Sequence, residues 1–173
     1  MAEVLLRHRL TALGVDARVH SAGLFVPGLP AHDDTARAMA AMGHDLAAHR
    51  SRRMTADMVG ESDLVLGLAR AHVREAVLLA PGAWPRCYTV KEAVRRAGIV
   101  GPRAPGQAFP AWVAALHAGR RREDLVGASA ADDVDDPYGR GLGTSERTAA
   151  ELDALVGELV ELGWARTSRG DAA

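Results

Sequence analysis

The chain has 173 residues, of which 48% are hydrophobic and 25% are charged, and its net charge is −1 at pH 7. This composition indicates a globular protein long enough to bury a core, and the nearly balanced charge predicts neither nucleic-acid binding nor attraction to an acidic membrane surface. No apolar run approaches the roughly 20 residues that a membrane-spanning helix needs, and the first residues lack the continuous apolar region of a signal peptide.

The chain contains a single cysteine, Cys87. One cysteine excludes an internal disulfide and a cysteine-rich zinc site. We therefore expect a cytoplasmic protein in a reducing compartment. Separately, no metal ion and no cofactor are expected.

The first part of the chain alternates between helical and strand patterns of apolar residues. In chain order, it predicts a helix at 1–13, a strand at 15–23, a loop at 27–30, a helix at 32–43, a short helix at 54–62 and a buried strand at 63–69. Thr55 is the expected N-cap of the short helix. The run at 63–69 is almost continuously apolar, which is typical of a parallel strand covered on both faces.

The same alternation continues toward the C-terminus. In chain order, we expect a helix at 69–82, a strand at 86–90, a helix at 91–98, a Gly/Pro-rich break at 98–109, a helix at 110–122, an irregular acidic stretch at 123–141 and a long helix at 144–163. Alternating strands and helices predict an α/β fold with three layers, in which helices cover both faces of a parallel sheet. We expect a single domain over residues 1–165 and a flexible tail over 166–173.

Several stretches, taken in order, resemble the low-molecular-weight protein tyrosine phosphatase family. "MAEVLLRHRL" resembles the helix that follows that family's phosphate loop, "VHSAGL" its second strand and turn, "HDLAAHRSRRMT" its His-x-x-Arg-type segment, "DLVLGLARAH" its third strand, and "DDPYG" its Asp-Pro-Tyr loop. The resemblance implies the doubly wound parallel sheet of a phosphotyrosine protein phosphatase I-like fold. Residues 98–131 fit less well and are expected to be an insertion that carries an extra helix.

The family's nucleophilic cysteine and phosphate-binding arginine lie in a Cys-x5-Arg loop that would precede Met1, and this loop is not in the sequence. Cys87 does not match it, because the residue six positions later is Ala93 and Cys87 lies in a predicted strand. A small buried thiol is the favoured interpretation of Cys87. We therefore expect this chain to lack a nucleophile, to lack the family's first central strand, and to be inactive alone.

Three explanations of the missing loop remain open. The natural protein begins roughly 15–20 residues earlier, the length of one strand and its turn; or the short chain is a non-catalytic module that binds phosphate or phosphoproteins; or the protein is another α/β binding domain. Loss of a central strand would leave neighbouring strands with unpaired backbone groups and exposed apolar faces. This cost favours the first explanation.

The resemblance also assigns the other residues of the site. Asp136, before Pro137, would be the general acid and base. Tyr138 and Phe25 would line the cleft around an aryl phosphate, and Ser21 and His49 would support the phosphate loop. From the residues alone, a solvated acidic turn, a surface tyrosine, a loop-anchoring phenylalanine and a structural histidine stay open as alternatives.

The function that the resemblance implies is hydrolysis of phosphomonoesters through a cysteinyl-phosphate intermediate. The substrate would be a phosphorylated protein or a small aryl phosphate, and the sequence does not choose between phosphotyrosine and phosphoarginine. Arsenate reduction is disfavoured because the related reductases use further cysteines and this chain has only Cys87. No nucleic acid or membrane is expected as a partner, and the oligomeric state is left undefined.

Overall fold

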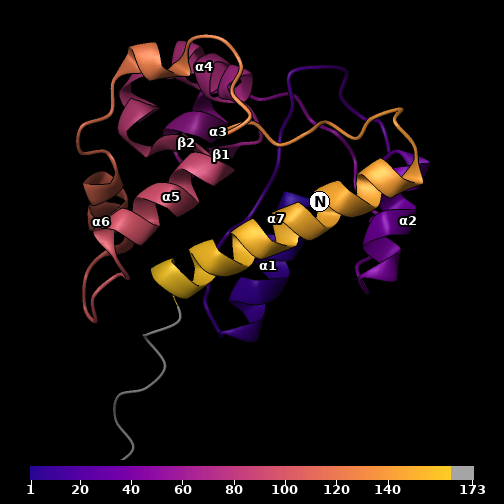
Figure 1. Ribbon diagram of the computed structural model, residues 1–173, viewed down its shortest axis with the longest axis horizontal. Helices are drawn as coiled ribbons and strands as arrows, with labels where there is room; N and C mark the ends of the chain where they lie inside the picture. The colour runs from indigo at the N-terminus through magenta and orange to yellow at the C-terminus, as the bar shows by residue number, and fades with distance from the viewer. Residues whose placement is uncertain (165–173) are drawn as a thin grey trace, which may run out of the picture. The chain divides into compact units, whose positions relative to one another are not determined.

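The computed structural model describes residues 1–164, which form helices and a small parallel sheet (Figure 1). The helices and strands are α1 (Ala2–Ala12), α2 (Asp33–Ala41), α3 (Ala56–Gly60), β1 (Val65–Gly67), α4 (Arg70–Leu79), β2 (Cys87–Thr89), α5 (Val90–Val100), α6 (Phe109–Leu116) and α7 (Leu142–Gly163), with short 3-10 segments at Pro81–Arg86 and Arg122–Leu125. Within residues 1–164, no helix is both long enough and apolar enough to cross a membrane.

The sheet consists of β1 and β2, which pair in parallel with Val65 opposite Cys87 and Gly67 opposite Thr89. A parallel pair needs a crossover connection, and α4 is the helix in that connection. The strands run between α4 and α5 in Figure 1. The predicted α/β fold with a parallel sheet is therefore confirmed, and all three residues of β2 are buried.

The described chain divides into two compact units. One contains Met1–Met54 and Val134–Gly157, and the other contains Thr55–Asp133 and the chain from Glu158 onward. The single domain expected over residues 1–165 stays a prediction, and the tail expected at 166–173 lies outside the described residues.

The local signals for the helices and for the strands at β1 and β2 were accurate. Thr55 caps α3 as predicted, because its Oγ1 accepts a hydrogen bond from the backbone N–H of Met58 at 3.3 Å. The second helix ends before Gly43, whose φ of 81° is the left-handed conformation that favours glycine at a helix C-terminus. An extra helix, α6, lies inside the stretch 98–131 where one was expected.

The strand predicted over residues 15–23 is wrong. Pairing is confined to one isolated parallel bridge between Gly23 and Arg53. There the N–H of Gly23 donates to Arg52 O at 2.8 Å and the N–H of Met54 donates to Gly23 O at 2.9 Å. A strand needs partners along its length for its backbone groups, and here only its last residue pairs with another segment.

Several helix ends also differ from the prediction, and the helix expected over 69–82 ends at Leu79. The helix expected to end at Gly98 continues to Val100, and Gly101, with a φ of 88°, follows it instead. The helix expected over 110–122 ends at Leu116, and Gly119 then adopts a φ of 72°. A left-handed residue redirects the chain, and the segment after it carries Arg120 into the interior.

Arg120 is a buried cation in the unit that contains the sheet, with 1% of its side chain exposed. Its Nε and Nη2 donate to the two carboxylate oxygens of Glu92 at 2.6 and 3.0 Å, and Nη2 also donates to Cys87 O at 2.7 Å. The guanidinium carbon lies 3.9 Å from the ring centroid of Trp84 and 4.0 Å from that of Tyr88. A buried charge is tolerated when it is paired and hydrogen-bonded, so these partners fix α5 against β2.

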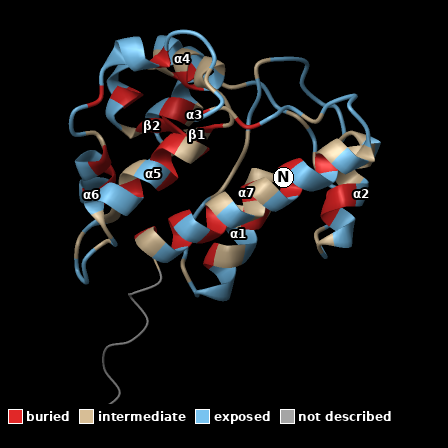
Figure 2. Ribbon diagram, in the orientation of Figure 1, coloured by how far each residue is buried: buried red, intermediate tan, exposed pale blue. Residues whose placement is uncertain are grey.

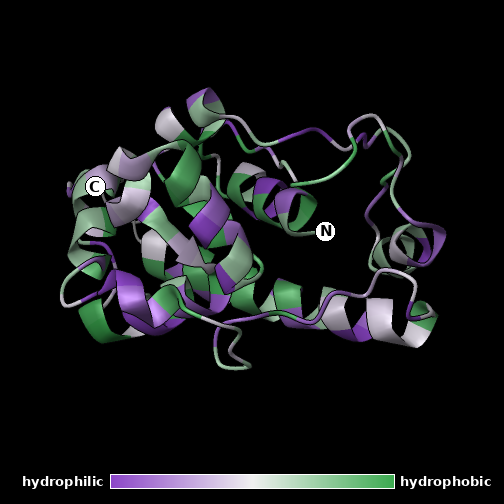
Figure 3. Cartoon of the chain, turned by 90° about the horizontal axis from the view of Figure 1, so that it is seen from above, coloured by the Kyte–Doolittle hydropathy of each residue, from purple (hydrophilic) through white to green (hydrophobic). Residues whose placement is uncertain are grey.

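The other unit is built on α1 and the first part of α7, which lie side by side in Figure 1. Arg9 of α1 donates to the carboxylate of Asp153 of α7 at 2.6 Å. Buried side chains recur at helical spacing on both helices: Leu5 and Leu10 on α1, and Ala149, Leu152 and Val156 on α7. Buried residues alternate with exposed ones along α7 (Figure 2), and hydrophobic residues alternate with hydrophilic ones along the same helices (Figure 3). This is the pattern of helices that cover a core with one face.

Replacing Glu92 with alanine is expected to destabilise the protein strongly, because Arg120 would keep its buried charge without a carboxylate partner. We expect a loss of about 3–5 kcal/mol in the free energy of unfolding, measured by urea denaturation. The control is Arg121→Ala, which removes an exposed pair with Asp124 and should cost less than about 1 kcal/mol. Equal losses in the two variants would contradict the role given to Glu92.

Candidate active site

The first turn of α1 carries a carboxylate that joins several segments of its unit. Ser21 Oγ donates a hydrogen bond to Glu3, and Arg7, one turn further along α1, forms an ion pair with the same carboxylate. Arg7 Nη2 also donates to Val19 O at 3.2 Å. The irregular segment that ends in the Ser21 turn is therefore tied to the start of α1 by polar contacts.

The charge of His49 also lowers the pKa of the Glu3 carboxyl group. Burial tends to raise the pKa of Glu3, but the hydrogen bond from Ser21, the charge and hydrogen bond of Arg7, and the charge of His49 outweigh burial and lower that pKa. Glu3 is therefore ionised at neutral pH. The structure brings Ser21 and His49, which were expected to support the site, to one shared partner.

Sequence reasoning missed Glu3 and Arg7 as members of this group. A carboxylate in a first helical turn is already explained by the helix dipole, and Glu3 with Arg7 has the i, i+4 spacing of an ordinary surface pair. The local sequence therefore carried no signal that Ser21, 18 residues away, would donate to Glu3.

Asp136 lies exposed in the loop before α7. Its Oδ1 accepts a hydrogen bond from the backbone N–H of Tyr138 at 3.0 Å, which forms a turn around Pro137. In the preceding residue, Asp135, the carboxylate Oδ2 lies 3.5 Å from Arg140 Nη1. The backbone oxygen of Asp135 accepts a hydrogen bond from Thr148 Oγ1 of α7 at 3.3 Å. The carboxyl group of Asp136 is thus accessible, in a loop that α7 holds on one side.

Tyr138 is also exposed, at 73%, and its ring packs edge-on against His32, with the ring centroids 5.1 Å apart. His32 is the N-cap of α2, where its Nδ1 accepts a hydrogen bond from the N–H of Asp34 at 3.3 Å. His32 was not predicted as a site residue, because a histidine before two acids indicates only a helix start. The structure makes it the neighbour that orients Tyr138.

Phe25 is 84% exposed in the loop that follows the Ser21 turn. Ser51 holds this loop in place: its Oγ donates to Val26 O at 2.8 Å and accepts from the N–H of Leu29 at 3.0 Å. Within the described residues, the ring contact of Tyr138 is with His32 and not with Phe25. The cleft wall formed by Phe25 and Tyr138 together therefore stays a prediction.

Asp132 and Asp133, a few residues before Asp136, have different partners. Asp132 forms ion pairs with Arg70 and Arg95, and Asp133 accepts from the backbone N–H groups of Arg70 and Ser129. Among the residues that the structure describes, no three His, Cys, Asp or Glu side chains are grouped so that they could hold a metal ion.

Cys87 is buried in β2, as predicted for a small buried thiol. Burial raises the pKa of this thiol to about 11, and the nearby charges of Arg86 and Arg120 offset that rise only in part. A thiol attacks as its thiolate. At pH 7 a pKa near 11 leaves about one thiol in ten thousand ionised, so Cys87 is poorly suited to nucleophilic attack.

Comparisons with known proteins show which family the chain resembles. A sequence model described as "low molecular weight phosphotyrosine protein phosphatase" matches residues 1–99. The probable low molecular weight protein-tyrosine-phosphatase EpsP of Ralstonia solanacearum is 36% identical over 76 residues, which cover 43% of this chain and 50% of that protein. The chain therefore spans about half the length of the curated relative it matches.

Solved structures show the same fold. The low molecular weight protein tyrosine phosphatase from T. tengcongensis has a TM-score of 0.68 and 28% sequence identity, and the match covers 92% of this chain and 87% of that one. The YwlE arginine phosphatase from Geobacillus stearothermophilus has a TM-score of 0.64 and 23% identity, with coverage of 92% and 80%. The second likeness is one of fold alone.

The Ser21→Ala substitution tests the group around Glu3. Loss of the Ser21 hydrogen bond should raise the pKa of Glu3 toward its ordinary value, measured by NMR titration of the carboxyl group, and should cost about 1 kcal/mol of stability at pH 7. A lowered carboxyl pKa stabilises the fold above the unfolded pKa of about 4.3, and this contribution disappears as the pH falls through the folded value. The difference between variant and wild type should therefore shrink as the pH falls below about 4.3.

Thr11→Ala, an exposed substitution in the last turn of α1, is the control for Ser21→Ala. It should leave the pKa of Glu3 unchanged. A Glu3 pKa that is the same in wild type and Ser21→Ala would show that the Ser21 hydrogen bond does not act on this carboxylate.

Proposed function

Because the chain belongs to the low molecular weight phosphotyrosine protein phosphatase family, we propose that the full protein hydrolyses phosphomonoesters through a cysteinyl-phosphate intermediate, with Asp136 as the general acid and base. The observation that carries this proposal is that Asp136 is exposed and that Tyr138, two residues later, has an exposed ring. The backbone N–H of Tyr138 donates to Oδ1 of Asp136, which leaves Oδ2 to hold a proton.

The chemistry has two steps. A cysteine thiolate attacks phosphorus, the bond to the leaving oxygen breaks, and Asp136 gives its proton to that oxygen. The Asp136 carboxylate then takes a proton from a water molecule, whose oxygen attacks phosphorus and displaces the thiolate as inorganic phosphate forms. A carboxyl group with one oxygen held by a backbone N–H and the other free can serve in both steps.

The nucleophile in this proposal is not Cys87. Its thiol is buried and its pKa is raised to about 11, whereas a nucleophilic cysteine needs a lowered pKa and a phosphate cradle of backbone N–H groups and arginine. We place the nucleophile in a Cys-x5-Arg loop outside these 173 residues, ahead of α1. Glu3, Ser21 and His49 at the start of α1 would then support that loop, and the chain by itself would be inactive.

The proposed substrate is a phosphorylated side chain of a protein, or a small aryl phosphate. Tyr138, held by His32, would contact the flat part of the substrate, and Phe25 would face it from the loop braced by Ser51. Both phosphotyrosine and phosphoarginine present a flat group next to the phosphate. One solved relative of the same fold is described as an arginine phosphatase, so both substrates should be assayed.

A second candidate function is a non-catalytic module that binds phosphoproteins. The observation that favours it is that the only thiol in the chain, Cys87, is buried. This candidate predicts that the 173-residue chain binds a phosphotyrosine peptide without turnover. Arsenate reduction is disfavoured by the same cysteine count, since it would need further thiols.

Replacing Asp136 with asparagine is expected to remove proton donation to the leaving oxygen. In a chain extended at its N-terminus by a family-type strand and Cys-x5-Arg loop, kcat should fall about 10²–10⁴-fold with phenyl phosphate, whose leaving group needs a proton. The fall should be much smaller with p-nitrophenyl phosphate. Asp135→Asn, the exposed neighbour, is the control and should affect both substrates little. Full activity of the Asp136 variant on phenyl phosphate would remove Asp136 from this role.

Cys87→Ala tests the position of the nucleophile. The 173-residue chain should not turn over p-nitrophenyl phosphate with either residue at position 87, and the extended chain should keep its kcat within about twofold after the substitution, because a buried thiol with a raised pKa takes no part in attack. Circular dichroism checks that the variant is folded. Turnover by the 173-residue chain that disappears with Cys87→Ala would contradict the proposal.

A further inference from the structure

The loop of residues 125–133 leads directly into the segment that carries Asp136. Four cationic side chains hold this loop, and we call them the basic clamp: Arg70 and Arg74 of α4, and Lys91 and Arg95 of α5. All four lie in the unit that contains the sheet, and Asp133 is the last loop residue of that unit before the chain continues at Val134.

Asp132 is the centre of the basic clamp. Its Oδ2 accepts a hydrogen bond from Arg70 Nε at 2.8 Å, and Arg70 Nη2 lies 2.7 Å from the same oxygen. Its Oδ1 accepts a hydrogen bond from Arg95 Nη2 at 2.8 Å. Only 9% of the Asp132 side chain is exposed. One carboxylate therefore links α4 to α5 through the loop.

The charge of Asp132 persists at neutral pH. Burial alone would raise the pKa of this carboxyl group, but the hydrogen bonds and charges of Arg95 and Arg70 more than offset burial and lower it. Charge-assisted hydrogen bonds of this kind are about twice as strong as neutral ones. The link between the two helices is thus maintained at neutral pH.

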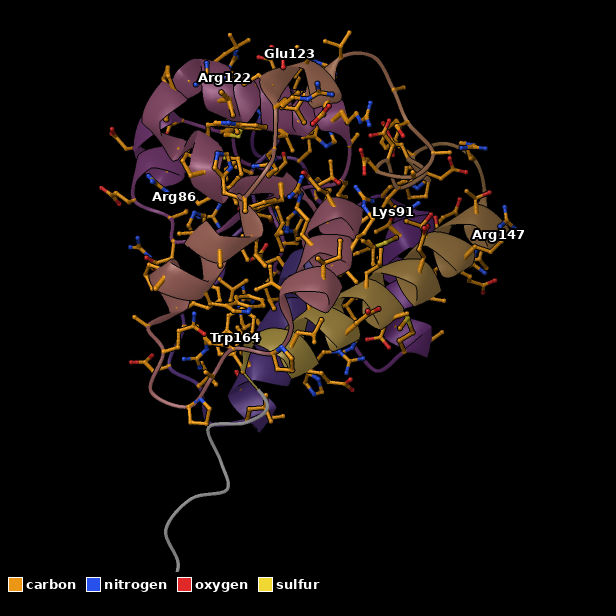
Figure 4. The ribbon with its side chains drawn as sticks, turned by 60° about the vertical axis from the view of Figure 1, so that its left-hand side comes forward. Arg86, Lys91, Arg122, Glu123, Arg147 and Trp164 are labelled. Atoms are coloured by element: carbon orange, nitrogen blue, oxygen red, sulfur yellow. The ribbon has the colours of Figure 1, made fainter. Side chains whose placement is uncertain are left out.

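The other members of the clamp bind the loop backbone, and Lys91 extends from α5 toward this loop (Figure 4). Arg74 and Lys91 donate to carbonyl oxygens along its length: Arg74 Nη1 to Leu125 O at 2.6 Å and Gly127 O at 3.0 Å, and Lys91 Nζ to Asp133 O at 2.7 Å and Ala130 O at 3.3 Å. The path of the loop is therefore held at several points and not only at Asp132.

Asp133 completes the anchor by capping α4. The N-cap residue of α4 is Ala69, whose side chain makes no capping hydrogen bond. Asp133 Oδ1 accepts from the N–H of Arg70 at 2.7 Å, and its Oδ2 accepts from the N–H of Ser129 at 2.8 Å. A carboxylate at a helix N-terminus is favoured by the exposed N–H groups and the helix dipole.

The contacts of Asp133 limit the positions that the Asp136 backbone can occupy. Asp136 follows Asp133 by three residues, so its Cα stays within about 11 Å of that anchor. On the other side, Thr148 of α7 donates to the backbone oxygen of Asp135. A residue whose chain neighbours are restrained loses less conformational entropy when its side chain must be placed for reaction.

We propose that Asp132, acting through the basic clamp, is a positioning residue for Asp136. Its carboxylate holds the upstream end of the loop, so that the carboxyl group of Asp136 is ordered before substrate binds. This inference rests on the proposed function of Asp136 as general acid. It gives Asp132 no contact with substrate.

The first test uses the 173-residue chain and the Asp132→Asn substitution, which keeps the size of the side chain and removes its charge. The backbone amide of Tyr138, which donates to Asp136, should exchange with deuterium about tenfold faster, as measured by NMR. Asp132→Glu should restore most of the protection. Asp124→Asn, an exposed acid paired with Arg121, is the matched control and should change nothing at Tyr138.

If Asp132→Asn does not fold, Arg95→Gln provides the same test, because Arg95 is half exposed and only one of the two partners is lost. An unchanged Tyr138 amide in a folded variant whose residues 126–133 exchange faster would overturn the proposal. The clamp would then stabilise its own unit without ordering Asp136.

The second test uses the extended chain with a Cys-x5-Arg loop. Asp132→Asn should lower kcat for phenyl phosphate about tenfold, with KM unchanged and with a smaller effect for p-nitrophenyl phosphate. Equal kcat values for wild type and variant on phenyl phosphate would overturn the positioning role. If Asp136→Asn itself leaves kcat unchanged, the proposed function fails, and the Tyr138 amide still decides whether Asp132 orders the loop.

Discussion

Arg120 brings a positive charge into the interior of the unit that contains the sheet, and the neighbouring elements are arranged around it. Glu92 of α5 neutralises the charge, the carbonyl oxygen of Cys87 in β2 accepts a hydrogen bond, and the rings of Trp84 and Tyr88 lie against the guanidinium group. Because an unpaired buried charge is strongly unfavourable, these contacts hold each of the elements against the cation. The orientation of α5 follows from this constraint.

Side chains of α5 also connect the buried Arg120 to the loop of residues 125–133, which precedes Asp136. Glu92 and Arg96 lie one turn apart on the face of α5 that meets Arg120, whereas Lys91 and Arg95, also one turn apart, bind the loop of residues 125–133. Residues spaced by four share a helix face. The helix α5 therefore contacts the buried Arg120 region with Glu92 and Arg96, and it binds the loop of residues 125–133 with Lys91 and Arg95.

Local signals explain what the sequence predicted correctly. Thr55 caps a helix as Ser, Thr, Asp and Asn usually do, the apolar run around Val65 is a parallel strand, and Cys87 is a buried thiol. The strand at 15–23 was wrong because a strand depends on a partner that its own residues do not specify. The Glu3–Ser21 contact and the basic clamp were missed for the same reason, since residues far apart in the chain form them.

We propose that catalysis uses a cysteine outside these 173 residues together with Asp136, and phosphoenzyme trapping distinguishes this cysteine from Cys87. The protein isolated from its native source would be mixed with an aryl phosphate, quenched in acid, and analysed by peptide mass spectrometry. We expect a peptide that extends ahead of Met1, contains Cys-x5-Arg, and carries a phosphoryl group on that cysteine, with Cys87 unmodified. A phosphoryl group on Cys87, or turnover by a protein that begins at Met1, would contradict it.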